Sequence, residues 1–344
     1  MSEHLQPAEK PVTESDEFIA RQLEDASIPT LMMSLIHLTG DTSLLRGAIR
    51  PKVVMMGGFQ GGLSEADQAN VRRLALQALK DYRDRGCTLP PQPSPALVQE
   101  MMNFMVGERV GDEYVPMMLE ELALDGNDSR APRWSREVPA AVREKFHVLV
   151  IGAGMSGLLQ ALRLKEAGIP FTVVEKNDSV GGTWYENRYP GCRVDIANHF
   201  YSYSFEPYAW SEYFSRRDEL LAYFRSFVAR HGLEAHIRYN TEVTAARYDE
   251  KNALWDVQLK SNGGAPGTMR VNAIVSAVGQ LNRPRIPDIT GREQFKGVQV
   301  HSAHWDPKLD LTGQRVAVVG SGASAFQLVP EVAKVAAKLY VFQR

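Results

Sequence analysis

A nearly unbroken apolar run in this 344-residue sequence, residues 146–151, leads straight into the pattern Gly-x-Gly-x-x-Gly, formed by Gly152, Gly154 and Gly157. Such a run is typical of a central strand in a parallel sheet, where both faces are covered. Apolar residues at helical spacing follow as far as Leu164. Strand, glycine turn and helix in this order predict an α/β fold with a Rossmann-like sheet.

Each glycine of this motif has a separate role in a dinucleotide site. Gly152 permits the tight turn, Gly154 lets the backbone approach a pyrophosphate, and Gly157 lets the helix pack closely on the strand. The helix N-terminus offers unpaired N–H groups to the phosphates. A second apolar run, 171–174, ends in Glu175, which lies 18 residues beyond Gly157 and suits the ribose hydroxyls. We therefore expect a dinucleotide here, the alternative being a purely structural glycine turn.

A second copy of the motif follows the apolar run 315–319. Gly320 and Gly322 occupy its first two glycine positions, and Ala325 stands in the third, which the motif tolerates. Ser324 lies inside the turn and is included among the expected nucleotide contacts. We expect a helix after it.

The strand that follows the second motif, 339–342, ends in Gln343 and Arg344 instead of an acid. An arginine at this position suits a 2′-phosphate, so NADPH is favoured over NADH; the alternative is a surface arginine. Two dinucleotide sites in one chain indicate hydride transfer from a nicotinamide to a flavin. The first site, with Glu175, is expected to hold FAD and the second NADPH.

The sequence ahead of these motifs is helical in pattern. We expect residues 1–14 to form a disordered tail and residues 15–135 to form a helical extension with its linker, with helices starting after Ser27, Ser64 and Ser94. Methionine-rich stripes on these helices are interpreted as core, with a partner-binding face as the alternative. The helical region hints at a homodimer.

Composition excludes several classes of protein. The 39 Lys and Arg residues balance 41 Asp and Glu residues, giving a net charge of −2, so no basic field is present for nucleic acid or an anionic membrane. No apolar stretch approaches the ~20 residues of a membrane span, and the N-terminus lacks a secretory pattern. Cys87 and Cys192 form neither a disulfide framework nor a metal cluster. We expect a cytoplasmic protein without a metal.

Residues 295–306 match a longer pattern, Phe-x-Gly-x₃-His-x₃-Trp-Pro/Asp, which resembles the fingerprint of type I Baeyer–Villiger monooxygenases. Its fixed positions are filled by Phe295, Gly297, His301, Trp305 and Asp306.

Residues 181–195 resemble the second fingerprint of the same family. Its positions are filled by Gly182, Trp184, Tyr189, Pro190, Gly191 and Asp195. The resemblance covers about 144–344, and the helical region is similar to the extension of the 4-hydroxyacetophenone monooxygenase subgroup. It implies an FAD-binding domain over 144–290, a fingerprint linker over 291–311 and an incomplete NADP-binding domain over 312–344.

The resemblance also implies a reaction. NADPH reduces FAD, the reduced flavin traps O₂ as a C4a-peroxide, and this attacks a ketone. Rearrangement inserts one oxygen atom to give an ester or lactone, while NADP⁺ stays bound. A dry pocket with a cation beside the anionic peroxide is the physical requirement.

Individual residues receive roles from the same resemblance. Asp195 is implied to position a catalytic arginine that the family carries beyond Arg344; the alternative is a turn carboxylate. His301 is implied to act at the hinge between the nucleotide domains, or as a structural histidine. Trp184 is expected either along the flavin or in the core, and Cys192 in packing.

Two further segments carry less specific expectations. The aromatic run 199–214 is interpreted as packing, with a pocket lining as the alternative. Ser215 is expected to cap a helix, and residues 236–279 are expected to form hairpins with turns at Lys251 and Gly263 before returning to the parallel sheet.

Two other functions remain open from the sequence. A flavin-containing monooxygenase acting on N or S atoms shares both nucleotide motifs and the histidine, although the Trp184–Asp195 segment and Trp305 argue against it. A non-catalytic nucleotide-binding fragment is the second alternative.

We expect the chain to be a fragment of a longer enzyme, because a half Rossmann unit cannot bury its own sheet. Purified 1–344 is therefore predicted to be poorly soluble or inactive. The measurement is NADPH consumption and ester formation with a ketone; ketone-dependent NADPH oxidation by this polypeptide would contradict the prediction.

Overall fold

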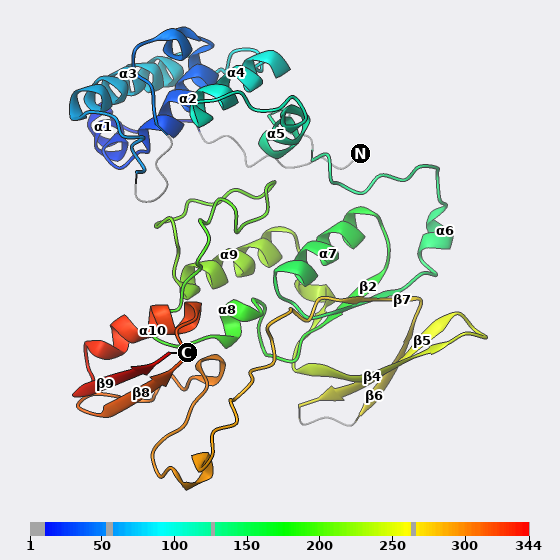
Figure 1. The fold of residues 1–344 in the computed structure, drawn as a ribbon. Helices are drawn as coiled ribbons and strands as arrows, with labels where there is room; N and C mark the ends of the chain where they lie inside the picture. The colour runs from blue at the N-terminus through cyan, green and yellow to red at the C-terminus, as the bar shows by residue number, and fades with distance from the viewer. Residues whose placement is uncertain (1–10, 53–57, 125–127, 263–265, 344) are drawn as a thin grey trace. The chain divides into compact units, whose positions relative to one another are not determined.

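The computed structural model describes residues 11–52, 58–124, 128–262 and 266–343 (Figure 1). By their internal contacts the residues group into two compact units, Met1–Arg130 and Ala131–Arg344, and each is described by itself. Arg344 and the expected turn at Gly263 lie outside the described residues. Among the residues described, no helix combines the length and apolar character needed to cross a bilayer.

The first unit is helical throughout its described part, as expected. A 3₁₀ turn, Ser43–Arg46, follows the second helix. The helices are α1 (Asp16–Leu23), α2 (Ile28–Thr39), α3 (Glu65–Asp84), α4 (Pro95–Val106) and α5 (Tyr114–Leu122).

Serine caps explain where three of these helices begin, and at α1 the hydroxyl of Ser15 accepts a hydrogen bond from Phe18 N at 3.3 Å. The hydroxyl of Ser64 accepts a hydrogen bond from Asp67 N at 3.1 Å, and Ser94 accepts one from Leu97 N at 3.2 Å. Ser27 also precedes its helix, but its hydroxyl donates to the Phe59 carbonyl at 3.1 Å. The start of α2 is therefore favoured by Pro29 in its first turn and not by a serine cap.

The core of the helical unit lies between α2 and α3. Ile28, Met32, Val71 and Ala75 are fully buried and belong to one cluster. Met32 therefore supports the interpretation of the methionine stripe as core. On α5, by contrast, Met117 is 48% exposed, and a homodimer through this unit stays a prediction.

The second unit is built on a parallel sheet with strand order β3-β2-β1-β7 within its described part. The strands are β1 (Val148–Ile151), β2 (Phe171–Val174), β3 (Ile237–Arg238) and β7 (Ala273–Ser276). Register pairs Val150 with Val173 on one side and with Val275 on the other. This confirms the predicted α/β class; β1 begins two residues later than predicted.

Helices cover one face of this sheet and an antiparallel sheet covers the other (Figure 1). Val148, Val150 and Val173 join the helices in one core, whereas Leu149 and Val174 join the second sheet, as alternating side chains require. The covering helices are α7 (Met155–Glu166), α8 (Thr183–Glu186) and α9 (Arg217–Arg230); the second sheet contains β4 (Thr241–Asp249), β5 (Leu254–Ser261) and β6 (Gly267–Val271). A short helix without buried residues, α6 (Ala140–Arg143), precedes β1.

Most of the aromatic run before α9 packs as expected. Tyr203 is buried, stacks on Phe205 with ring centroids 5.6 Å apart, and lies 4.5 Å from the Phe227 ring. Phe200, Tyr213 and Phe214 are exceptions; Phe200 is 84% exposed. The predicted cap at Ser215 is wrong: Arg216 is the N-cap residue of α9, and the Ser215 hydroxyl bonds the Glu219 carboxylate instead.

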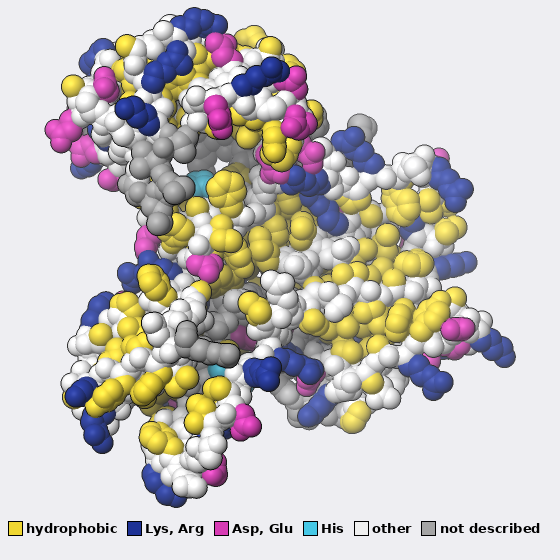
Figure 2. Space-filling model, viewed as in Figure 1, with side chains coloured by type: hydrophobic (Ala, Val, Ile, Leu, Met, Phe, Trp, Pro, Cys, Tyr) yellow, Lys and Arg dark blue, Asp and Glu magenta, His cyan; other side chains and the backbone are white. Residues whose placement is uncertain are grey.

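The second glycine motif also forms strand, turn and helix. Strands β8 (Arg315–Val319) and β9 (Lys338–Phe342) pair in parallel, and α10 (Ala323–Ala333) runs on through Pro330. Figure 2 shows hydrophobic side chains over this region, and Phe326 is 82% exposed. The exposed apolar faces expected of an incomplete sheet are therefore present among the described residues.

A core substitution in the helical unit tests this packing. Met32→Ala should lower the free energy of unfolding by about 2–5 kcal/mol, because it removes a fully buried side chain and leaves a cavity. Met117→Ala, at the exposed position on α5, should change it by less than about 0.5 kcal/mol. Denaturant unfolding followed by circular dichroism measures both; equal losses would contradict the assigned core.

Candidate functional site

The turn after β1 admits only glycine at two positions. Gly152 has φ +101°, and a Cβ there would lie 2.7 Å from the Ala277 carbonyl oxygen. A Cβ on Gly157 would collide with the Gly152 carbonyl oxygen. The backbone of α7 therefore lies closest to the glycine turn at Gly157. These contacts agree with the tight-turn and helix-packing roles expected of the motif.

Gly154 and Gly182 bring two backbone segments together at the start of α7. A Cβ on Gly182, which has φ +50°, would lie 3.0 Å from the Gly154 Cα, and Gly181 N donates to the Ala153 carbonyl at 3.0 Å. Gly154 is the N-cap residue of α7, and within the described chain no side chain caps that helix. Its first N–H groups are thus left for an anion, and the narrow cradle fits a pyrophosphate such as that of FAD.

Glu175 lies at the end of β2 and is only 4% exposed. One carboxylate oxygen accepts a hydrogen bond from Ala153 N at 2.8 Å, and the other accepts bonds from the backbone and side-chain nitrogens of Asn177 at 2.9 and 2.8 Å. The acid thus ties the glycine turn to the strand end, and Oε2, which accepts only the bond from Ala153 N, keeps a lone pair for a ribose hydroxyl. Sequence reasoning missed Asn177, which carries no motif signal.

The second cradle, at the start of α10, is more open than the first. Gly320 has φ +112°, and Gly322 is the N-cap residue of α10. A Cβ at Gly322 would have no described atom within 4 Å, and no described side chain caps the helix. Ser324 is half-buried and interacts with the Tyr189 phenol. Arg344, predicted for a 2′-phosphate, lies outside the described residues.

Asp195 is exposed in the loop that leads away from α8, and none of the hydrogen bonds or ion pairs found among the described residues involves its carboxylate. Large hydrophobic side chains of the following segment are also exposed; they are Ile196, Phe200, Tyr213 and Phe214. This surface leaves the carboxylate available to a group from another segment.

The structure favours packing for Trp184. Its ring is buried in the main core, its indole N–H donates to the Tyr201 hydroxyl at 3.2 Å, and its carbonyl accepts from Arg217 Nε at 2.7 Å. The cofactor contact considered from the sequence is therefore the weaker alternative at this position.

His301 has a structural contact in the fingerprint linker. Its Nδ1 accepts a hydrogen bond from Ala303 N at 3.1 Å and so caps the 3₁₀ turn Ser302–His304. Trp305 packs against the main core, whereas Phe295 is exposed. The linker is thus attached to the unit at its tryptophan end.

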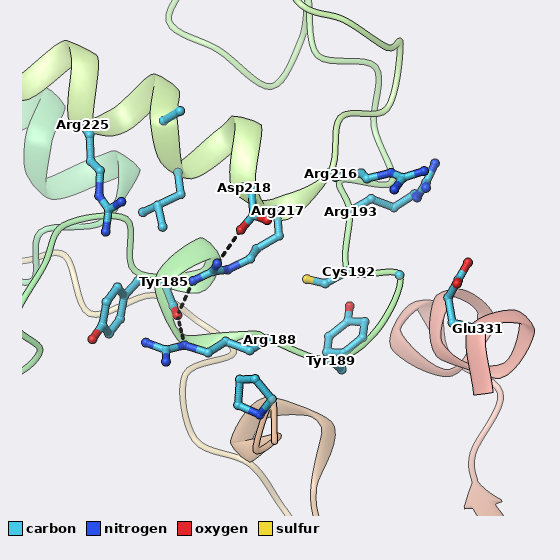
Figure 3. A pocket seen from close by; sticks show the side chains of 14 residues that line it. Tyr185, Arg188, Tyr189, Cys192, Arg193, Arg216, Arg217, Asp218, Arg225 and Glu331 are labelled. Carbon is cyan, nitrogen blue, oxygen red and sulfur yellow. Dashed lines mark hydrogen bonds and ion pairs between the residues drawn. The ribbon is translucent and has the colours of Figure 1, made fainter. Parts of the chain in front are cut away.

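A cleft of about 840 Å³ lies between α8, the start of α9 and α10 (Figure 3). Arginines dominate its described lining: Arg188, Arg193, Arg216, Arg217 and Arg225, with Asp218 and Glu331 as acids. Arg217 Nη1 pairs with Asp218 at 2.5 Å, and Arg188 Nε donates to the Tyr185 carbonyl at 3.1 Å. The wall carries excess positive charge and attracts anions.

Cys192 lies against the same cleft but is inert. The residue is buried, and burial raises the pKa of its thiol, so little thiolate forms at neutral pH. This agrees with the packing role expected of it. Among the residues described, no three His, Cys, Asp or Glu side chains gather as metal ligands would.

The family model for flavin-binding monooxygenase-like proteins matches residues 145–344, which span both glycine cradles. The chain belongs to this family.

Curated relatives agree with that assignment. An uncharacterised monooxygenase of Sinorhizobium fredii is 37% identical over 95% of this chain and 48% of its own length. A Baeyer–Villiger monooxygenase of Streptomyces coelicolor is 42% identical over 59% of this chain and 38% of its own length. The chain spans less than half the length of these relatives.

Solved structures agree as well. OTEMO in complex with FAD and NADP is 40% identical, covers 58% of this chain and 39% of its own, and superposes with a TM-score of 0.54. Cyclohexanone monooxygenase from Rhodococcus, bound to NADP⁺, gives 35% identity over 58% of this chain and 39% of its own, and a TM-score of 0.53. The resemblance to Baeyer–Villiger monooxygenases is confirmed; the 4-hydroxyacetophenone subgroup stays a prediction.

The first cradle generates a matched test. Gly154→Ala should leave the fold intact, because Gly154 has φ −81° and its Cβ would meet Gly182 Cα at 3.5 Å, but the methyl group fills the space for a phosphate. We expect the Kd for FAD to rise at least about tenfold, or ~1.4 kcal/mol. Gly267→Ala, on strand β6, is the control.

Flavin fluorescence during FAD titration measures both affinities, and circular dichroism checks the fold. Unchanged FAD affinity in a folded Gly154→Ala variant would contradict the assignment of this cradle.

Proposed function

We propose that the whole protein is an FAD- and NADPH-dependent Baeyer–Villiger monooxygenase, which inserts one oxygen atom from O₂ into a ketone to give an ester or lactone. The observation that carries the proposal is the presence of two uncapped glycine cradles, at α7 and α10, in one compact unit. Two dinucleotides held together suit hydride transfer between them. When bound, reduced FAD supplies the chemistry that activates O₂.

The first cradle is proposed to hold FAD. Gly152, Gly154 and Gly157 would accommodate its pyrophosphate at the start of α7, with Gly182 closing the cradle from the opposite side. Glu175 would accept a hydrogen bond from the ribose through the remaining lone pair of Oε2. Support also comes from the FAD named with OTEMO, a structure 40% identical to this chain.

The second cradle is proposed to hold NADPH. Gly320 and Gly322 would admit its pyrophosphate, Ser324 would donate a hydrogen bond from inside the turn, and Arg344 would pair with the 2′-phosphate. The open geometry around Gly322 leaves room for a ligand without displacing any described atom. His301 would keep the linker in place between the two nucleotide domains.

Asp195 is proposed to position a catalytic arginine supplied by another segment. Support comes from its exposed carboxylate, which is free to pair, and from the apolar surface around it, which excludes water when covered. A carboxylate that holds a guanidinium in place acts by positioning it. A displacement of the guanidinium by about 1 Å costs on the order of 100-fold in rate.

The deciding experiment incubates the whole protein with FAD, NADPH and O₂, and with a ketone or a thioether. Mass spectrometry of the products should show ester or lactone in excess over sulfoxide. Dominant sulfoxide would favour a flavin-containing monooxygenase acting on N or S atoms instead, and flavin binding without any oxygenation would favour a non-catalytic nucleotide-binding protein.

Asp195→Asn tests the proposed positioning residue. Ester formation should fall about 100-fold, whereas reduction of the flavin by NADPH should change little, because the nicotinamide step does not need the arginine–carboxylate pair. Asp288→Asn, at an exposed aspartate of another loop, is the control. An Asp195→Asn variant with wild-type ester formation would contradict this role.

A further inference from the structure

The side-chain amide of Gln327 joins α10 to the loop 189–195 across more than 130 residues of sequence. Its Oε1 accepts a hydrogen bond from the Tyr189 hydroxyl at 2.9 Å and another from Arg193 N at 3.1 Å. Its Nε2 donates to the Arg193 carbonyl at 2.9 Å. The backbone donor and acceptor of Arg193 fix which end of the amide is oxygen.

The Gln327 amide bonds both the N–H and the carbonyl of Arg193, as the backbone of a neighbouring β-strand would. On its other side, the same stretch of loop pairs with the segment before α9: Arg193 forms an antiparallel bridge with Arg216, and Val194 N donates to the Ser215 carbonyl at 3.1 Å. The loop is therefore held on one side by the segment leading into α9 and on the other by α10.

The loop also lies in direct contact with α10. Gly191 has φ +78°, and a Cβ there would stand 2.5 Å from the Gln327 carbonyl oxygen and 2.9 Å from Glu331 Cγ. Since such contacts leave no space for a side chain, a displacement of α10 is transmitted to this loop.

Tyr189 extends the connection to the second glycine turn. Its side chain is buried, and burial raises the pKa of the phenol to about 12, so the hydroxyl stays protonated and donates to Gln327. The same phenol interacts with Ser324, inside the turn proposed to hold NADPH. Ser324 and Gln327 lie one turn apart on α10.

We propose that Gln327 is a positioning residue that couples the second nucleotide site to Asp195. Asp195 lies two residues beyond Arg193, and its carboxylate is placed by a loop whose contact with α10 is the Gln327 amide, supported by Gly191 and Tyr189. Binding of a nicotinamide dinucleotide at the start of α10 then orders the loop. This inference rests on the proposed function.

Hydrogen exchange of residues 188–196 in the whole protein, loaded with FAD, measures the coupling. NADP⁺ should slow exchange in this segment at least about fivefold, the lower end of ordinary coupling between sites. Gln327→Leu should abolish that slowing while FAD stays bound. Gln258→Leu, at an exposed glutamine on β5, is the matched control and should keep it.

Two further variants keep the inference testable if Gln327→Leu does not fold. Tyr189→Phe removes one hydrogen bond and leaves both bonds to Arg193, so it should weaken the slowing. Gln327→Glu keeps the acceptor for Arg193 N but places a carboxylate oxygen against the Arg193 carbonyl. This variant should therefore weaken the NADP⁺-dependent slowing of exchange more than Tyr189→Phe does. Wild-type slowing in both folded variants, or no slowing in the wild-type protein, would overturn the proposal.

The outcomes separate this inference from the proposed function. A wild-type protein that shows the NADP⁺ response but oxygenates no ketone contradicts the function and supports the coupling. A wild-type protein that forms ester without any NADP⁺ response contradicts the coupling alone.

Discussion

The close approach of the Gly154 and Gly182 backbones is the contact on which the first nucleotide site depends. It brings the loop before α8 against the start of α7, with a hydrogen bond from Gly181 N to the Ala153 carbonyl. Glu175 completes the arrangement by accepting from Ala153 N at 2.8 Å. A side chain at either glycine would narrow the space in front of the helix N-terminus, where an anion is best stabilised.

The second glycine motif repeats this arrangement with fewer supporting contacts. Around Gly320 and Gly322 no described atom lies close enough to meet an added Cβ, and β8 pairs with β9 alone among the described strands. Leu328 and Val332 bury one side of α10 in the main core, and the loop 189–195 adds polar and close contacts through the Gln327 amide and Gly191. The loop that carries Asp195 is therefore part of the contact between the two nucleotide motifs.

Local patterns predicted most of the fold. The apolar runs at 171–174 and 315–319 became strands at those bounds, because a buried strand and a glycine turn are set by neighbouring residues. Ser215 was predicted wrongly, since its hydroxyl had a competing partner in Glu219 four residues on. No local signal distinguishes a capping serine from one that bonds such a carboxylate.

Contacts between segments that are distant in the chain could not be predicted from the sequence. Nothing around Gln327 or Arg193 indicates that they meet, because their pairing is set by how α10 lies against the loop. Trp184 was placed in the core by Tyr201 and Arg217, neither of which its fingerprint includes. The motifs predicted which residues serve nucleotide binding, and tertiary packing decided which of them remain accessible.

In the proposed function, the two cradles bring a nicotinamide to a flavin. Mixing the FAD-loaded whole protein with NADPH in the absence of oxygen tests it most directly. We expect the yellow flavin absorbance to disappear as one NADPH is consumed per FAD. A flavin that stays oxidised while NADPH is bound would contradict it.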